Sequence, residues 1–361
     1  MSNLNEERKI INEIDKEMAS LFEKRMRAVE RIAEYKKEAG LPIFDKEREE
    51  EVIRERSKLI ADDELRAHYV TFLKNNMALS RSYQEKLLSG MKVAYSGTVG
   101  AFAYIAATKL FPTAKTLGYP DFASAYSAVE RGECDVAVLP LENSYNGEVG
   151  QVTDLMFSGS LYINEITDVA ITQDLLGVAG ASLSDIKKVI SHPQALGQCA
   201  DFIKEKGLIT EEYSNTALAA KAVSELGDKS IGAIASLEAA DIFGLEVIAR
   251  NINASRTNTT RFAVFSRAEN TYARKQSGVH TVILFTVRNE AGALAKAINV
   301  IGKHGFNMQT LRSRPMKELL FQYYFYVEAE GNLNTEEGEA MLRELSEYCD
   351  KLKSVGSYVK K

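Results

Sequence analysis

The sequence contains little cysteine and no long apolar segment. Its three cysteines, Cys134, Cys199 and Cys349, are widely spaced and odd in number, which argues against a disulfide framework and against a cysteine-based metal site. No stretch approaches the run of about 20 apolar residues that a membrane span needs. The first residues, MSNLNEERK, lack the apolar core of a secretory signal. We therefore expect a cytoplasmic protein without a membrane partner.

The chain also lacks an excess of positive charge. Its net charge is −5, so binding along a nucleic acid is not expected, and any anion site must be a local cluster of cations. A length of 361 residues exceeds one ordinary core and suggests two or three domains.

Helix breakers are scarce in the first 90 residues, where Pro42 is the one proline and Gly40 the one glycine before Gly90. The apolar residues there follow helical spacing, which predicts helices over 4–38, 45–59 and 64–88. The first would be roughly 50 Å long at 1.5 Å per residue. Three such helices cannot close a core alone, so we expect an all-α domain over 1–90 that forms an intertwined dimer.

From residue 91 short β-like runs alternate with helical stretches, which is typical of α/β architecture. Two such sets, 91–165 and 166–245, predict two lobes around a cleft, and RFAVFSR at 261–267 is expected to be a closing strand. Polar residues at 268–278 predict a linker. The segment 279–361 then has the order βαββαβ, an α+β module with helices over 291–304 and 335–349. The prediction is a multidomain chain of three modules.

Polar residues interrupt an apolar stripe on the first helix. In alternating steps of three and four, this stripe carries Arg8, Arg25 and Lys36. They can be cations at the stripe edge whose stems lie on apolar surface. Burying several of them without an anion is costly, however, and a bound anionic ligand would remove that cost.

The other two helices carry comparable groups. Ser80 and Gln84 lie one turn apart on the apolar stripe of the third helix, whereas Asp45, Arg48 and Glu49 are neighbours on the second. The latter three can also form a simple surface ion-pair cluster. Asp45 is a plausible N-cap.

Together these eight polar residues resemble the pattern of the all-helical chorismate mutase family over residues 4–88. The resemblance implies that Arg25, with Arg8 from the opposite subunit, binds the carboxylates of chorismate. It implies that Lys36 and Gln84 donate hydrogen bonds to the breaking ether oxygen. The remaining members of the substrate site would be Asp45, Arg48, Glu49 and Ser80. A helical region that serves only for dimerisation is the alternative.

Three polar motifs stand at the expected strand ends of the middle region, namely PLENSYNG (140–147), SHPQALGQC (191–199) and NTTRFAVF (258–265). Each alone is commonly a turn or a cap. Their shared placement, where clefts of α/β proteins form, favours a site.

The order of these motifs, with the opening KVAYSGTVGAFAYIAA, resembles prephenate dehydratase over 91–267. The resemblance implies the loss of water and carbon dioxide from prephenate, with Thr260 as hydrogen-bond donor to the departing hydroxyl. Arg261 can pair with a substrate carboxylate or buttress the cleft, and His192 can equally be a structural loop residue. Ala101 and Ala103 stand where many relatives carry hydroxyl residues. The substrate-binding candidates are Asn143, Ser144, His192, Gln194 and Arg261.

Gly292 lies where the first strand of the last module meets its first helix, a position suited to ligand contact with backbone N–H groups or to a simple capped turn. The region 279–359 resembles ACT domains fused to prephenate dehydratase, which implies phenylalanine binding between two subunits. Arg312 departs from the family, which commonly has an acidic residue there. The effector-binding candidates are Asn289, Ala291, Gly292, Ala293, Leu294, Arg312, Ser313, Arg314 and Pro315.

The three resemblances together imply an enzyme that converts chorismate to prephenate and then to phenylpyruvate, inhibited by L-phenylalanine, without cofactor or metal. Two rival hypotheses are a dehydratase that prefers arogenate and a two-lobed sensor without catalysis.

Overall fold

The computed structural model describes residues 4–39, 41–254, 257–269, 278–316 and 322–360. The chain divides into two compact units, Met1–Lys92 and Val93–Lys361. Each is described by itself below.

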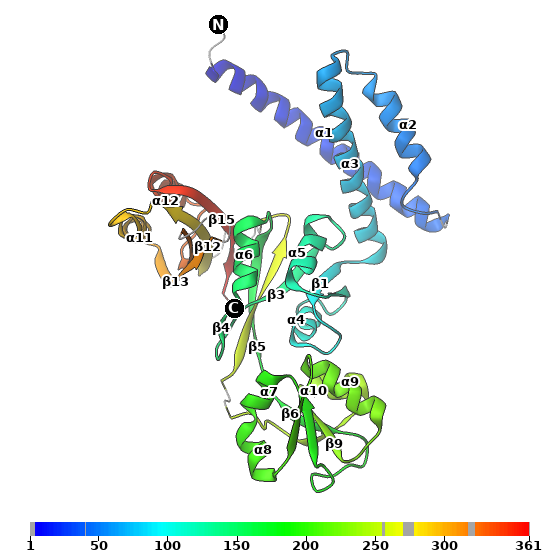
Figure 1. The fold of residues 1–361 in the computed structure, drawn as a ribbon. Helices are drawn as coiled ribbons and strands as arrows, with labels where there is room; N and C mark the ends of the chain where they lie inside the picture. Colours follow the sequence, from blue (N-terminus) through cyan, green and yellow to red (C-terminus); the bar gives the residue numbers. More distant parts are fainter. Residues whose placement is uncertain (1–3, 40, 255–256, 270–277, 317–321, 361) are drawn as a thin grey trace. The chain divides into compact units, whose positions relative to one another are not determined.

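The first unit consists of helices α1 (Leu4–Glu38), α2 (Lys46–Ser57) and α3 (Asp63–Ser89), which confirms the three expected helices (Figure 1). Asp45 and Asp62 begin the second and third helices, because each carboxylate accepts backbone N–H groups of the first turn. The expected break at Gly40 lies outside the described residues.

The apolar stripe of α1 is mostly uncovered within one chain. Only Val29 and Ala33 are buried on this helix, whereas Ile11, Leu21 and Phe22 are 56%, 62% and 44% exposed. Burial of such residues stabilises a protein by about 1.5–3 kcal/mol each. In the single chain, the apolar surface of α1 that is expected to contact a partner helix therefore stays exposed.

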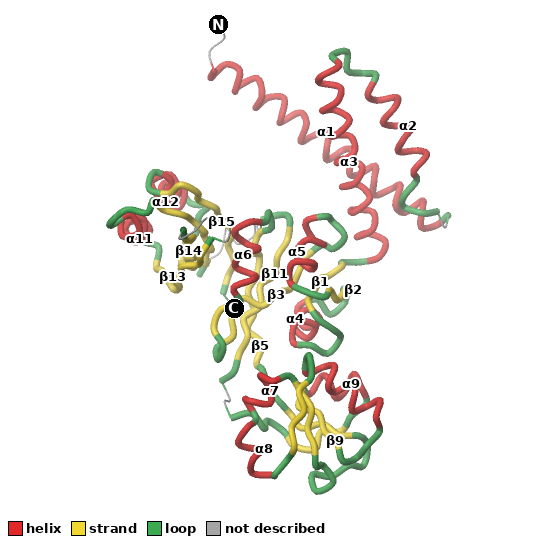
Figure 2. Tube along the Cα trace, viewed as in Figure 1, coloured by secondary structure: helices red, strands yellow, loops and turns green. Residues whose placement is uncertain are grey.

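The second unit begins with a six-stranded sheet that forms the first lobe (Figure 2). Along the sheet the order is β2-β1-β3-β11-β5, with β4 paired to β3. The strands are β1 (Lys92–Ser96), β2 (Lys115–Tyr119), β3 (Val136–Asn143), β4 (Gly147–Glu148), β5 (Tyr162–Ala170) and β11 (Thr259–Ser266). The helices are α4 (Phe102–Leu110), α5 (Phe122–Glu130) and α6 (Gly150–Ser158). The closing strand over 261–267 is thus confirmed as part of β11.

The second lobe has a five-stranded sheet of order β10-β6-β9-β7-β8. Its strands are β6 (Asp174–Gly177), β7 (Lys188–Ser191), β8 (Ile209–Glu212), β9 (Ile231–Ala235) and β10 (Glu246–Ala249). Its helices are α7 (Pro193–Gln198), α8 (Ala200–Lys206), α9 (Thr216–Leu226) and α10 (Leu237–Phe243). The expected lobe boundary at 165 was wrong, because β5 continues to Ala170 in pairing with β11 of the first lobe.

The C-terminal module has the expected βαββαβ order. Its elements are β12 (Val279–Val287), α11 (Ala293–Lys303), β13 (Asn307–Pro315), β14 (Tyr323–Glu330), α12 (Glu336–Ser346) and β15 (Cys349–Val359). The last helix ends before the expected residue 349, since Cys349 already pairs with Val287 of β12. Most of the expected linker at 268–278 lies outside the described residues.

This module shares a hydrophobic core with the first lobe. Val282, Leu284 and Val355 of its sheet pack in one cluster with Leu141 and Ile163, whereas α11 and α12 cover a separate cluster. Gly356, at φ +132°, allows the close approach of β15 to β5, because a Cβ there would lie 2.4 Å from the Ile163 carbonyl oxygen. The module is therefore packed against the lobe rather than tethered beside it.

In the part of the chain that the structure describes, no helix is long and apolar enough to cross a membrane.

Candidate active sites

In the helical unit, Arg25, Ser80 and Gln84 are brought together across α1 and α3. The Arg25 guanidinium donates to the Ser80 hydroxyl, and the Gln84 amide donates to the Ser80 carbonyl at 3.3 Å. Ser80 and Gln84 are buried, and the Gln84 Oε1 atom has no hydrogen-bond partner among the described residues. Burial lowers the pKa of Arg25, and no described carboxylate forms an ion pair with it. A part-buried cation without a carboxylate partner among the described residues is suited to an anionic ligand.

Lys36, further along α1, and Glu49 of α2 have partners of their own. The Lys36 ammonium donates to the Ile43 carbonyl at 2.5 Å, which leaves two of its three hydrogens for a ligand. Glu49 of α2 forms a part-buried ion pair with Arg81 of α3. Arg81 was missed by the sequence reasoning, although it directly follows Ser80.

The structure does not bring Arg8, Asp45 and Arg48 to this group. Arg8 is exposed on the N-terminal part of α1, and Asp45 serves as the N-cap of α2. Arg48 pairs on the surface with Glu51. In the single chain, Arg48 therefore corresponds to the expected alternative of a surface ion pair.

A hollow of about 1050 Å³ lies among the three helices. Its lining is mainly apolar, with Arg25 at its wall, and includes Met18, Phe22, Tyr69, Leu73 and Met77. Such a hollow combines space for an organic ligand with a cation for a carboxylate.

In the second unit, strand directions bring the polar motifs to one edge of each sheet. β1 runs parallel to β3, and β11 runs antiparallel to both β3 and β5. The ends of β1, β3 and β5 and the start of β11 therefore share the edge at which the chain crosses to the second lobe. In that lobe β7 and β9 are parallel and β6 is antiparallel to β9, so His192, after β7, shares an edge with Asp174, where the chain enters. Both lobes thus direct these ends toward the crossover, where ligands of α/β folds bind.

Asn143 organises the first-lobe side of this site. Its Oδ1 accepts the backbone N–H groups of Tyr145 and Asn146, both at 3.0 Å, so its Nδ2 must be the donor. Nδ2 donates to Asn258 Oδ1 at 2.8 Å and to the Thr260 hydroxyl at 2.9 Å. Within the described residues Thr260 donates no hydrogen bond in return. Its hydroxyl hydrogen is therefore free for a substrate.

Asn258 is a candidate that the sequence reasoning did not single out. It is 3% exposed, and its Nδ2 has no hydrogen-bond partner in the described part of the chain. A buried donor without a partner costs about 1–3 kcal/mol, which a bound substrate would offset. In the sequence, the indication that Asn258 belongs to a site was its position as the first residue of the motif NTTRFAVF.

The other candidates lie around this centre in structural roles. Ser144 joins two loops, since its hydroxyl donates to the Thr257 carbonyl and accepts from Thr259 N–H. His192 is the N-cap of α7, where its Nδ1 accepts the N–H of Gln194 at 3.2 Å, and the Gln194 side chain is exposed.

The opening motif reaches the second lobe through its backbone. A Cβ at Gly100 would lie 3.2–3.3 Å from Phe243 and Ala217 of that lobe. Ala101 begins α4 without a side-chain cap, as its departure from the hydroxyl residues implied. Thr98, beside it, has a buried hydroxyl without a described partner.

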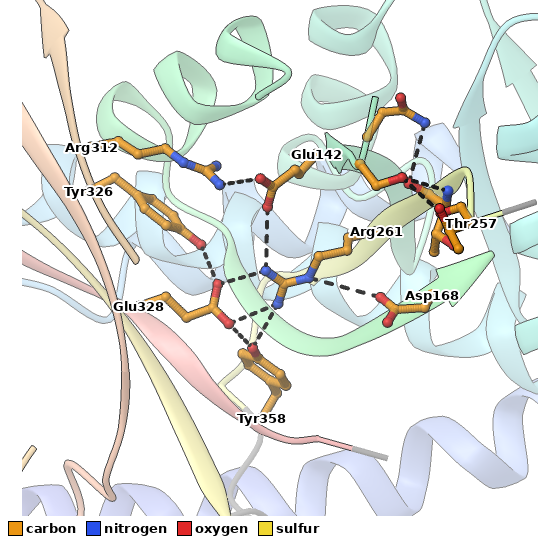
Figure 3. Close-up of polar contacts among 11 residues, drawn as sticks. Glu142, Asp168, Thr257, Arg261, Arg312, Tyr326, Glu328 and Tyr358 are labelled. Carbon is orange, nitrogen blue, oxygen red and sulfur yellow. Dashed lines mark hydrogen bonds and ion pairs between the residues drawn. The ribbon is translucent and has the colours of Figure 1, made fainter. Parts of the chain in front are cut away.

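Arg261 is directed away from Thr260, as expected for successive residues of a strand. Its guanidinium binds Glu328 and the Tyr358 hydroxyl of the C-terminal module (Figure 3). This arrangement corresponds to the expected alternative in which Arg261 buttresses the cleft.

The effector candidates divide between two surroundings. Gly292 adopts φ +81° at the start of α11, without a side-chain cap, and Asn289 and Ala291 beside it are exposed, whereas Ala293 and Leu294 are partly covered. Ser313 and Pro315 are exposed on β13. Arg312 and Arg314 instead contact the first lobe, through Glu142 and Asp154.

Comparison with known proteins defines the class of enzyme. A family model described as prephenate dehydratase matches residues 93–270, and one described as chorismate mutase type II matches residues 7–85. The two matches correspond to the two-lobed region and to the helical unit.

The relatives agree with this division. The chain is 34% identical to the bifunctional chorismate mutase/prephenate dehydratase of Aquifex aeolicus, over 100% of this chain and 99% of that protein. It is also 34% identical to arogenate dehydratase/prephenate dehydratase 1 of Arabidopsis thaliana, over 75% of this chain and 72% of that protein. The chain therefore belongs to the family of bifunctional chorismate mutase/prephenate dehydratases and is an enzyme of phenylalanine biosynthesis.

Two solved structures resemble the larger unit. Prephenate dehydratase from Arthrobacter aurescens in complex with L-Phe is 26% identical, with a TM-score of 0.68 over 75% of this chain and 90% of that chain. GqqA, described as a novel type of quorum quenching acylase, is 33% identical, with a TM-score of 0.69 over 75% of this chain and 98% of that chain.

Proposed function

We propose that the helical unit rearranges chorismate at Arg25, Lys36 and Gln84, and that the two-lobed cleft converts the product, prephenate, to phenylpyruvate at Thr260. The observation that carries the second assignment is the Thr260 hydroxyl, which accepts from Asn143 and keeps its own hydrogen free. Both reactions need oriented donors rather than a nucleophile, and both sites consist of such donors.

The mutase reaction is a pericyclic rearrangement, so the site needs to restrict a dicarboxylate and stabilise charge on the ether oxygen. Arg25 binds one carboxylate, and Arg8 of the partner subunit binds the other. The Lys36 ammonium keeps two hydrogens for the ligand, and Gln84 Nε2, which donates one hydrogen to the Ser80 carbonyl, keeps its second. Each well-placed donor is worth roughly 3–4 kcal/mol in such a site.

In the dehydratase reaction the electrons of the breaking bond to carbon dioxide enter the ring, and the ring hydroxyl leaves with its electron pair and takes up a proton from the solvent to become water. Aromatisation drives this step. A threonine hydroxyl is a very weak acid, so Thr260 acts as an oriented hydrogen-bond donor to the leaving oxygen. Asn143 holds Thr260 in the donating orientation, and the free Nδ2 of Asn258 supplies a second donor nearby.

The test of both activities is a time course with purified protein and chorismate. We expect prephenate to form first and phenylpyruvate to follow at its expense. Prephenate as the final product would contradict the cleft assignment. The turnover of arogenate, measured beside that of prephenate, tests the rival substrate. This rival is relevant because two relatives are named for both dehydratase activities. Faster turnover of arogenate would favour that rival.

We further propose that the C-terminal module is an ACT domain that binds L-phenylalanine between two subunits and inhibits the dehydratase. Gly292, at the start of α11, offers backbone N–H groups to a carboxylate. The loop at 289–294 and Pro315 lie at the same end of the sheet, and β13 is an edge strand open to a second copy. The Arthrobacter aurescens relative binds L-Phe.

Isothermal titration of the full chain with millimolar L-phenylalanine is expected to release or absorb measurable heat. Gly292→Ala should weaken the binding, because its left-handed conformation disfavours a side chain by about 1–2 kcal/mol. Gly302→Ala, on the same helix with open space around it, is the matched control and should bind normally. The absence of heat with the unsubstituted protein would count against the effector assignment.

A homodimer or higher homo-oligomer is part of the same proposal. It is supported by the uncovered apolar residues of α1 and by the open edge of β13. The cytoplasmic location stays a prediction.

A further inference from the structure

Two neighbouring cross-strand pairs connect the dehydratase site with the C-terminal module. Thr260 of β11 pairs with Asn143 of β3, and the next residue, Arg261, pairs with Glu142. Because successive side chains of a strand point to opposite faces, the second pair is directed away from the first. It meets the sheet of the C-terminal module.

Arg261 is held there mainly by one buried carboxylate. Its guanidinium donates to the two oxygens of Glu328 at 2.8 and 3.0 Å, whereas Glu142 and Asp168 lie at 3.6 and 3.9 Å. The Glu328 side chain is 4% exposed and also accepts from the hydroxyls of Tyr326 and Tyr358 (Figure 3). Burial alone would raise the pKa of Glu328, but these hydrogen bonds outweigh it and lower the pKa. The carboxylate is therefore ionised and fully paired at neutral pH.

A second contact reaches the other strand of the site. Arg312 of β13 forms an ion pair with Glu142 and lies over the Tyr326 ring at 5.8 Å. Both strands that carry the proposed reacting groups are thus bound by charges on the C-terminal sheet, one residue away from Asn143 and Thr260.

The backbone ladder between β3 and β11 is irregular at this point. The register of β11 against β3 shifts between Arg261 and Phe262, and such a bulge interrupts the regular hydrogen bonds. Side-chain contacts on Arg261 then contribute to the placement of the segment that precedes the bulge.

We propose that Glu328, from the C-terminal module, is a positioning residue for the dehydratase, which orients Thr260 relative to Asn143 by binding Arg261. The inference rests on the proposed role of Thr260 and adds a residue outside the cleft. A displacement of about 1 Å at reacting groups can reduce turnover about 100-fold, so a modest shift of β11 has a large effect on rate.

The test compares two ion pairs that join the same two parts of the protein. Glu328→Gln removes the charge that binds Arg261, and Asp154→Asn removes the charge that binds Arg314 at 2.9 and 3.2 Å. Asp154 lies on α6, which packs on β3, but its carboxylate binds Arg314 and Tyr324 of the C-terminal module. We expect Glu328→Gln to lower kcat for prephenate about 10- to 100-fold, with KM within about twofold, and Asp154→Asn to leave kcat unchanged. Glu328→Asp, which retains the charge, should recover a large part of kcat.

Arg261→Gln keeps the test decisive if Glu328→Gln fails to fold, because it removes the other member of the same ion pair and Arg261 is only partly buried. It should lower kcat in the same way. A thermal unfolding transition of the larger unit like that of the unsubstituted protein shows that each variant is folded, since mutase turnover reports on the helical unit. Full kcat in Glu328→Gln or, where that variant is unfolded, in Arg261→Gln would overturn the proposal, as would an equal loss in Asp154→Asn. Full activity of Thr260→Ala would instead refute the role of Thr260.

Discussion

Replacement of Thr260 by alanine is expected to reduce dehydratase turnover about 100- to 1,000-fold, the usual cost of removing one positioned hydrogen-bond donor. The hydroxyl is held by Asn143 Nδ2 at 2.9 Å, and its hydrogen has no acceptor among the described residues. Alanine removes the donor to the leaving oxygen and leaves Asn143 with one partner fewer. The measurement is phenylpyruvate formation from prephenate.

Two controls separate chemistry from folding. Thr260→Ser keeps the hydroxyl and should retain most of the activity, and chorismate mutase turnover should not change in either variant. A Thr260→Ala enzyme with unchanged kcat would remove Thr260 from the mechanism. Equal losses in the alanine and serine variants would indicate that the methyl group, and hence packing, is what matters.

Mixing two inactive mutase variants is expected to restore activity if sites are shared between subunits. Arg8→Ala and Lys36→Ala should each lower mutase turnover by about 100-fold or more, as loss of a charged donor in a catalytic site does. Arg8 is exposed in the single chain, whereas Lys36 lies at the other end of the same helix, part-buried near α2. In a twofold dimer each site would combine Lys36 of one chain with Arg8 of the other.

Equal mixing with free exchange then produces mixed dimers in half of the molecules, each with one unaltered site, so about one quarter of the full activity should return. The mixture is measured after joint unfolding and refolding, with each variant refolded alone as control. Recovery no greater than that of the separate variants would contradict a shared site. Dehydratase activity in the same samples reports the yield of refolded protein.

The helical unit was largely predictable from sequence because its information is local. Apolar spacing and the carboxylate caps at Asp45 and Asp62 define where the helices begin, and both operate within a few residues. The exposed stripe of α1 also follows from the sequence, since its residues are too apolar for solvent and too many for the short helices beside them.

The proposed dehydratase site was predictable as motifs but not as a geometry. Turn-forming residues after apolar runs placed Asn143 and Thr260 at strand ends, yet 117 positions separate them. Their hydrogen bond depends on β11 returning to pair with β3 after a complete second lobe. Asn258 was missed for the same reason, because its burial and its unpartnered Nδ2 appear only when the strands meet.

Arg261 and Arg312 show most clearly what could not be predicted from the sequence. From the sequence, Arg261 could pair with a substrate carboxylate or buttress the cleft. Arg312 stood, without explanation, where the family commonly has an acidic residue. The fold provides a carboxylate for each, Glu328 for Arg261 and Glu142 for Arg312. Charge alone could not identify these partners, since many carboxylates in the chain are equally suitable.

By itself the sequence determined the three modules, their order and the residues that we propose for each reaction, because helical periodicity, turn chemistry and short motifs are local properties. The tertiary structure alone decided which of those residues meet. It paired Thr260 with Asn143 and turned Arg261 toward the C-terminal sheet, since the direction of a side chain follows from strand register, and register is set by contacts between segments far apart in the chain.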